Sequence, residues 1–430
     1  MTAVFRLGFR SLLYRKKQYV SLLLVCMVGV GVSLFCLFLV NGMLDSLEHK
    51  ARLYYGGDLM FIGGKNDLSF DYVDDFITTL TPLFPAEVSI SARFDYDARY
   101  SSLYFEGAEV KQRVIKGVDF NRERELFEGF NYVEGSAGNM ADSNGILLSE
   151  PIARSLGVHA GDSITFFLTT AQGYTNTAEL QVHGIFRDSS LFGMYTSYMD
   201  IDCLRESYGA QSHWANRICL SFPQGHAIKS SDLSFYQSEL ERHFTMFPLV
   251  EDKQIFYDDL QGGKFEEPHY LLVSLYANLE DLKILLDAMN LITSFVILIL
   301  IAIIVIGVSS TYRVIVMKRI NEIGIYKAIG MRRPDIIKVL LSEMTVLIGA
   351  GCVAGIVFSV ALCRIIVAFN FSFVPAFDIF LVDGILRPEI SGSQFLIISI
   401  LVYVTTSLAV LFSVQKSIKT TPVEALGVTE

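Results

Sequence analysis

Few residues of this 430-residue chain are spaced as catalytic groups are. Two Gly-Gly-Lys runs, at 63–65 and 262–264, lack the upstream glycine of a nucleotide-binding phosphate loop, and Asn66 and Phe265 follow them in place of Ser or Thr. The sequence contains neither a G-x-S-x-G nucleophile turn nor an H-E-x-x-H zinc pair. We therefore expect a non-catalytic chain that binds no cofactor itself.

The sequence offers equally few candidate residues for metal binding or redox chemistry. An acidic cluster between residues 251 and 267 lacks the spacing of an EF-hand, and a solvated loop explains it as simply. Its members are Glu251, Asp252, Asp258, Asp259, Glu266 and Glu267. Cys203 and Cys219 either form a disulfide in an oxidising compartment or remain two buried thiols. No cysteine or histidine spacing indicates a metal site.

Four apolar segments account for much of the 52% hydrophobic composition. Residues 18–44, 288–312, 344–363 and 390–415 contain no Asp, Glu, Lys or Arg. About 20 apolar residues span a hydrocarbon core, and a soluble core helix would show a polar face. The first run is too long for a signal peptide. We predict an α-helical membrane protein with four transmembrane helices and a large mixed α/β extracytoplasmic domain between helices 1 and 2.

Charge distribution orients these helices. Residues 1–17 hold five basic groups and no acidic one, and residues 313–338 hold seven basic and two acidic groups. Residues 43–287 hold 19 basic and 37 acidic groups. Because short loops rich in Lys and Arg stay in the cytoplasm, both termini and the 313–338 loop are predicted inside. Glu343 and Arg364 are the ionisable exceptions near the third apolar run, so an ion-coupled transporter is disfavoured.

The chain is thereby divided into ten predicted segments. They are a cytoplasmic amphipathic entry helix (1–17), transmembrane helix 1 (18–44), an extracytoplasmic α/β domain (45–269), a stalk helix (270–290), transmembrane helix 2 (291–312), a cytoplasmic coupling segment (313–336), transmembrane helix 3 (337–368), an external loop (369–393), transmembrane helix 4 (394–414) and a cytoplasmic tail (415–430). Short β-prone runs in the external domain, such as 59–62, 114–118 and 179–186, indicate strands.

The predicted stalk carries a heptad-like apolar seam that runs into transmembrane helix 2. Its members are Leu275, Leu279, Leu282, Leu286 and Met289. One interpretation is a helix packed on its own domain. The other is a stalk that pairs with an extension of the first span, through Leu44, Leu47 and Ala51, and transmits motion.

The internal loop is the most informative segment. A basic helix leaves the membrane near Lys318, a short segment with Gly324 and Gly330 follows, and Pro334 begins the next helix at a first-turn position. Apolar residues alternate with Glu322 and Lys327 in the short segment, a pattern that a plain positively charged loop does not need. A short cytoplasmic helix of this kind suits docking into a groove on a partner protein.

At these residues the chain resembles the FtsX-like, or MacB-type, permeases of ABC transporters. Residues 318–330 resemble the family's R-x-x-E-I-G-I-x-x-A-x-G signature, and 421–426 resemble its terminal P-x-E-A-L, although Gly427 replaces a frequent basic residue. Residues 145–164, 116–119 and 182–186 resemble strands of the family's external domain. Together these motifs make the resemblance cover nearly the whole chain.

The resemblance implies partners and a mechanism. An ABC ATPase dimer would bind inside and hold the ATP, since this chain lacks the fused ATPase of MacB, and a second permease copy would complete a homo- or heterodimer. The coupling residues would be Arg319, Glu322, Ile323, Gly324, Lys327, Ala328 and Gly330. Motion would pass through the stalk to the external domain without substrate crossing the bilayer.

Three functions fit this expectation. Val40-Asn41-Gly42-Met43 and Asp378-Ile-Phe-Leu381 resemble patterns of the lipoprotein-releasing permeases, which favours a lipophilic substrate at the outer face of the inner membrane. A signalling scaffold for an external cell-wall hydrolase is the second, with a periplasmic partner, and an efflux permease for peptides or macrolides is the third. Membrane lipid is an expected partner and nucleic acid is not.

Overall fold

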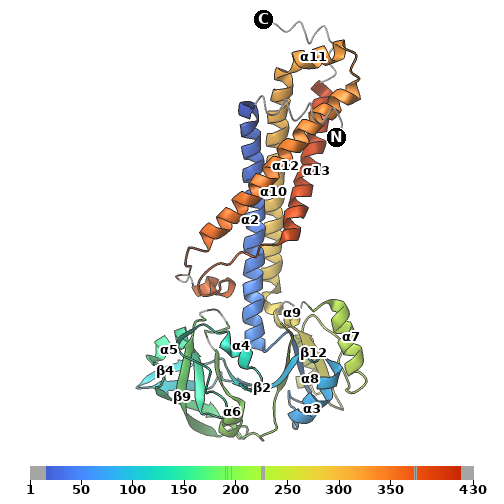
Figure 1. Cartoon of the computed structure of the whole chain (residues 1–430). Helices are drawn as coiled ribbons and strands as arrows, with labels where there is room; N and C mark the ends of the chain where they lie inside the picture. Colours follow the sequence, from blue (N-terminus) through green and yellow to red (C-terminus); the bar gives the residue numbers. More distant parts are fainter. Residues whose placement is uncertain are drawn as a thin grey trace. The chain divides into compact units, whose positions relative to one another are not determined.

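The computed structural model describes residues 16–417 except 189, 191, 195, 224–227, 372 and 374 (Figure 1). Nearly all of the predicted entry helix and tail, and the 421–426 motif, lie outside the described residues. The chain divides into two compact units. The first comprises residues 1–43, 285–370 and 386–430, and the second comprises 44–284 and 371–385.

The first unit is helical. It contains most of α2 (Lys16–Tyr55) and α10 (Glu280–Lys318), together with α11 (Ile320–Ala328), α12 (Arg333–Ile366) and α13 (Gly392–Ser417). In the described part of the chain, four helices are long and apolar enough to cross a membrane, at Tyr19–Tyr55, Leu285–Lys318, Arg333–Ile366 and Gly392–Phe412. The prediction of four apolar helices is confirmed.

A buried apolar stripe places α2 against α10 and α12. The stripe repeats every four residues, which keeps it on one helix face, and its members are Leu22, Cys26, Val30, Leu34 and Phe38. Glycines allow close approach: a Cβ at Gly29 would lie 2.2 Å from the Ile304 side chain, and one at Gly355 would lie 2.9 Å from Val30. Figure 1 shows α2 and α10 alongside each other.

The outer faces of these helices stay apolar and exposed. On α10 they include Leu291, Phe295, Leu298 and Ile306, each more than 60% exposed. Exposed apolar surface of this extent is unfavourable in water and normal against lipid. The packing therefore agrees with the apolar runs in indicating a membrane-spanning unit.

The second unit is built on one sheet. Its strands are β1 (Leu59–Gly64), β2 (Ser89–Asp97), β3 (Ser102–Phe105), β4 (Ala108–Lys111), β5 (Val114–Val118), β6 (Tyr132–Gly135), β7 (Gly145–Ser149), β8 (Ser163–Thr169), β9 (Thr175–Phe186), β10 (Thr196–Asp200), β11 (Arg217–Ser221) and β12 (His269–Ser274). Their order is β12-β1-β11-β2-β5-β10-β7-β9-β8-β3-β4, and β6 pairs with β9. Most neighbours are antiparallel, with β5–β10 and β7–β9 parallel.

Short helices cover this sheet. They are α3 (Val73–Leu80), α4 (Arg124–Glu128), α5 (Glu150–Leu156), α6 (Ile201–Tyr208), α7 (Ser230–Leu240), α8 (Gln254–Gln261) and α9 (Leu275–Asn278), with 3-10 turns at Thr81–Leu83 and Pro375–Phe380. The main apolar core includes Phe61, Leu103 and Ile115, all fully buried. A mixed α/β domain is confirmed, and in chain order it follows α2 and precedes α10.

The stalk helix predicted at 270–290 is wrong in its first five residues, which form a strand. Residues 270–274 belong to β12, and Leu271, Leu272 and Val273 are buried in the sheet. The helix begins as the short α9, breaks at Leu279 and resumes as α10 at Glu280. A strand buried on both faces reads as a continuous apolar run, which sequence periodicity does not separate from a buried helix.

Candidate coupling site

The coupling segment folds as the sequence predicts. α11 is a helix of nine residues, and α12 begins after Arg332 with Pro334 in its first turn, where a missing N–H costs nothing. Gly330 ends the turn after α11 with φ +89°, a left-handed conformation that favours glycine. The Met331 amide donates to the Tyr326 carbonyl over 3.0 Å, which satisfies one of the free carbonyls at the helix end.

A buried ion network fixes the start of α11. Nη1 of Arg319 lies 2.5 Å from Oε2 of Glu343 in α12, and its Nε lies 2.9 Å from Oε2 of Glu322. The same Nη1 donates to the Tyr19 hydroxyl of α2 over 3.4 Å. Arg319 thus connects three helices. Burial opposes its charge, but the bonds to Glu343 and Glu322 outweigh burial and raise the pKa of Arg319.

The predicted coupling residues divide between the two faces of α11. Ile323 and Gly324 are buried against the helical unit, and Arg319 anchors that side. The opposite face is exposed: we call Asn321, Ile325, Ala328 and Ile329 the coupling surface. Ile325 and Ile329 are 54% and 75% exposed. Glu322 and Lys327 lie between these faces, half-buried.

The predicted stalk residues reach α2 in part. Leu275 and Leu279 form a small buried cluster with Ala51, and Leu282 packs against its edge. The Tyr55 hydroxyl donates to the Asn278 carbonyl over 3.0 Å, and the Tyr276 hydroxyl donates to Glu48 over 2.7 Å. These contacts agree with the interpretation in which this seam meets the extension of the first span. Leu286 is half-buried and belongs to the helical unit.

The loop between α12 and α13 contributes to the second unit. Residues 371–385 belong to it, and Nζ of Lys50 lies 2.9 Å from Oδ2 of Asp378 and 3.5 Å from Oδ1 of Asp188. The side chains of Lys50 and Asp378 are nearly buried. The Asp378 motif that resembled a permease pattern therefore holds this loop to the C-terminal part of α2.

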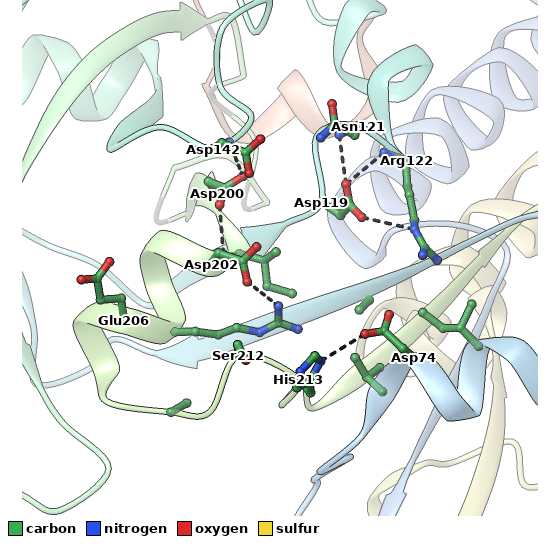
Figure 2. Close-up of a pocket in the computed structure, with 16 residues that line it drawn as sticks. Asp74, Asp119, Asn121, Arg122, Asp142, Asp200, Asp202, Glu206, Ser212 and His213 are labelled. Carbon is green, nitrogen blue, oxygen red and sulfur yellow. Dashed lines mark hydrogen bonds and ion pairs between the residues drawn. The ribbon is translucent and has the colours of Figure 1, made fainter.

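A polar cavity of about 580 Å³ opens beside α3 and α6 (Figure 2). Figure 2 shows that its carboxylates are largely paired within the wall: His213 Nδ1 is 3.3 Å from Asp74 and Arg205 Nη1 is 2.7 Å from Asp202. Burial raises the pKa of Asp200, which caps α6 through two backbone amides. Among the described residues, no group of His, Cys, Asp and Glu is arranged to hold a metal ion.

Cys203 and Cys219 do not form the disulfide left open above. Both are free thiols, and Sγ of Cys219 donates to the Tyr55 carbonyl over 3.2 Å. Burial raises the pKa of Cys219 to about 12 and that of Cys203 to about 11. The acidic cluster near residue 258 is split between α8 and the adjoining loops, where Lys264 pairs with Asp259.

Comparison with known proteins gives a family match over the C-terminal part of the chain. Residues 275–422 match the family model described as FtsX-like permease C-terminal. No curated protein matches. Among solved structures, the periplasmic region of MacB from Actinobacillus actinomycetemcomitans is 11% identical with a TM-score of 0.33, over 54% of this chain and 95% of that chain. The family match contains α11, its coupling surface and three of the four long apolar helices. The family that the motif at 318–330 predicted is confirmed over residues 275–422, which match the FtsX-like permeases.

Proposed function

We propose that this chain is the non-catalytic permease subunit of an ABC transporter, moved by a separate ATPase that binds α11. The observation that carries this proposal is the division of α11 into an anchored face and an exposed one. Arg319 fixes the helix to α2 and α12, so a displacement of α11 moves these helices rather than a free loop.

The coupling surface has the chemistry of a docking helix. Ile325 and Ile329 lie one turn apart and are exposed, as anchors for a partner groove are before binding. Exposed Arg332 and Arg333 follow directly and add positive charge beside the apolar anchors. An apolar patch with a charged rim is typical of a protein interface.

The charge distribution supports an inner-membrane location with α11 and both termini in the cytoplasm and the sheet domain outside. The ATPase would act as a dimer and hold ATP, so this chain would pair with a second permease copy to present two coupling surfaces. Motion would then be passed outward along α2, which continues from the helical unit into the sheet domain.

The substrate we propose is lipophilic, such as a lipoprotein released at the outer face of the membrane. Support comes from the resemblance of residues 40–43 to the lipoprotein-permease pattern. Within that pattern Gly42 is required by packing, because a Cβ there would lie 1.9 Å from the Arg387 carbonyl oxygen. The Glu389 amide donates to the Phe38 carbonyl beside it, over 3.0 Å. Glycine thus allows the segment before α13 to contact α2 directly.

The test is ATPase stimulation in a reconstituted complex. The double variant Ile325→Asp/Ile329→Asp is expected to lose the stimulation and the co-purification of the ATPase, because two carboxylates would be buried in an apolar groove. Lys338→Glu, an exposed change on α12, is the matched control and should leave both unchanged. Normal stimulation by the double variant would refute α11 as the input.

The substrate class requires a separate assay. Proteoliposomes that hold the complex and a fluorescent lipoprotein should release the lipoprotein only with ATP. ATP-dependent activation of a cell-wall hydrolase, or export of a macrolide, without lipoprotein release would instead identify the signalling or efflux function.

A further inference from the structure

The outer end of α2 is embedded in the sheet domain. A helix leaves its last four carbonyls without partners inside the helix, and each needs one elsewhere. The Arg52 carbonyl accepts from the amides of Gly56 and Gly57, and the Tyr55 carbonyl accepts from the Cys219 thiol. The two carbonyls between them, of Leu53 and Tyr54, need donors from another part of the chain.

Arg93 supplies both. Its Nη1 donates to the Leu53 carbonyl over 3.1 Å and to the Tyr54 carbonyl over 3.0 Å. The side chain is 0% exposed, and β2, which carries it, lies between β11 and β5 inside the sheet. A cation at a helix C-terminus is also favoured by the helix dipole.

Glu123 holds the guanidinium in place. Its carboxylate pairs with Nε and Nη2 of Arg93, with an Nε–Oε1 distance of 2.9 Å, and also accepts from the Ser91 hydroxyl over 2.7 Å. Arginine is suited to this position because its rigid fork serves a carboxylate on one side and carbonyls on the other. We call Arg93 and Glu123 the α2 clamp.

Neighbouring residues fit closely around the clamp. Nζ of Lys116 lies 4.1 Å from the centre of the Tyr54 ring. Gly56 has φ +89°, and a Cβ there would lie 2.6 Å from Nε of Arg93 and 2.7 Å from Sγ of Cys219. Only glycine combines this backbone conformation with such an approach.

We propose that Arg93 is the positioning residue through which α2 and the twelve-stranded sheet move as one body, so that displacement of α2 reorients the external domain. This inference rests on the proposed function for the source of the displacement. The clamp connects the last turn of a long apolar helix to an interior strand, whereas a surface contact would allow the helix end to slip.

The test uses the full chain in lipid nanodiscs. The variant Arg93→Met/Glu123→Gln removes the helix-end donor without leaving an unpaired buried charge, so the domain should still fold. The control is Arg217→Met, which removes a guanidinium from the position paired with Arg93 on β11. Arg217 contacts Asp95, Met60 and Tyr257, all outside α2. Fluorescence of Trp214, the single tryptophan, reports whether the domain is folded.

Hydrogen exchange of residues 50–57 is the first measurement. We expect the clamp variant to exchange roughly tenfold faster, or about 1.4 kcal/mol of lost local stability, while the control keeps the unmodified rate. The second measurement adds the ATPase. The nucleotide-dependent change in exchange across β2 should persist in the control and disappear in the clamp variant, with ATP hydrolysis still stimulated.

The failures are distinguishable. Unchanged protection of residues 50–57 in the clamp variant would overturn the clamp, whatever the ATPase does. A nucleotide response across β2 that survives loss of the clamp would overturn transmission through Arg93. If the unmodified chain does not stimulate an ATPase, the proposed function fails and the transmission of ATP-driven motion fails with it.

Discussion

Nη1 of Arg319 and Oε2 of Glu343 lie 2.5 Å apart, and the two side chains are 3% and 0% exposed. The pair joins the residue before α11 to the interior of α12. Charges so deeply buried are costly unless paired, so each residue depends on the other.

Glu343→Leu should therefore destabilise the helical unit. It leaves Arg319 with Glu322 as its carboxylate partner, and breaking a buried pair costs about 3–5 kcal/mol. Thermal unfolding of the purified chain in detergent measures the loss. Arg319→Met/Glu343→Leu removes both charges and should recover most of it; equal loss in the single and double variants would contradict this account.

Glu322→Lys should abolish substrate-stimulated ATPase activity without blocking membrane insertion. The change removes a carboxylate 2.9 Å from Nε of Arg319 and places a second cation beside it. The start of α11 then loses the ion pair that positions it. A charge-assisted hydrogen bond is worth roughly 1.5–3 kcal/mol. Stimulation is measured against Lys338→Glu, and full activity of Glu322→Lys would show that this end of α11 is not used in coupling.

Gly355→Leu should separate α2 from α12. A Cβ at Gly355 already lies 2.9 Å from Val30, and Gly351 and Gly355 form a small-residue motif of the kind that lets membrane helices approach. Overpacking costs about 1–3 kcal/mol. Gly349→Leu is a matched control on the same helix, since a Cβ there meets nothing within 4 Å. The melting temperatures of the two variants are compared, and that of Gly355→Leu should be the lower. Equal values would refute the close contact between α2 and α12.

The sheet domain should lose stability in acid through Asp95. Burial raises its pKa, but Lys116 and Arg217 outweigh burial and lower the pKa of Asp95 to about 2, against an ordinary 3.8. A depressed carboxyl pKa stabilises the fold above pH 3.8, and this contribution of about 2 kcal/mol is lost as pH falls towards 2. Unfolding followed by Trp214 fluorescence should show the difference between the unmodified chain and Asp95→Asn shrinking over that range, whereas a constant difference would exclude the assignment.

The two thiols of the sheet domain should stay reduced and unreactive. Cys219 is fully buried with a raised pKa, so little thiolate forms near neutral pH. Mass spectrometry after alkylation of the folded chain should find Cys219 unmodified, and denaturation should expose it. A Cys203–Cys219 linkage in unreduced protein would contradict the structure.

Local pattern predicted the parts of this fold that depend on neighbouring residues. The charge-free runs gave the four long helices, and the strand predicted at 114–118 is β5 with the same bounds. The short helix of the internal loop and the role of Pro334 also followed from sequence, because helix ends have local signals.

Features that depend on distant contacts were missed. β2 was not predicted, although apolar residues alternate along 89–97 as in a strand. The role of Arg93 on this strand could not be predicted, because the partners of its side chain lie 30 to 40 residues away, at Glu123 and at Leu53 and Tyr54. Glu343 was noticed as a rare charge near an apolar run, but nothing in its surroundings indicated Arg319 as the partner.

The pairing of β1 with β12 has an evolutionary consequence. The strand that follows α2 and the strand that precedes α9 and α10 are hydrogen-bonded neighbours, with Leu59 opposite Ser274. The domain therefore has its two ends adjacent, as modules that tolerate genetic insertion and replacement do. A recombination event at this seam would exchange the sheet domain while the long apolar helices stayed unchanged.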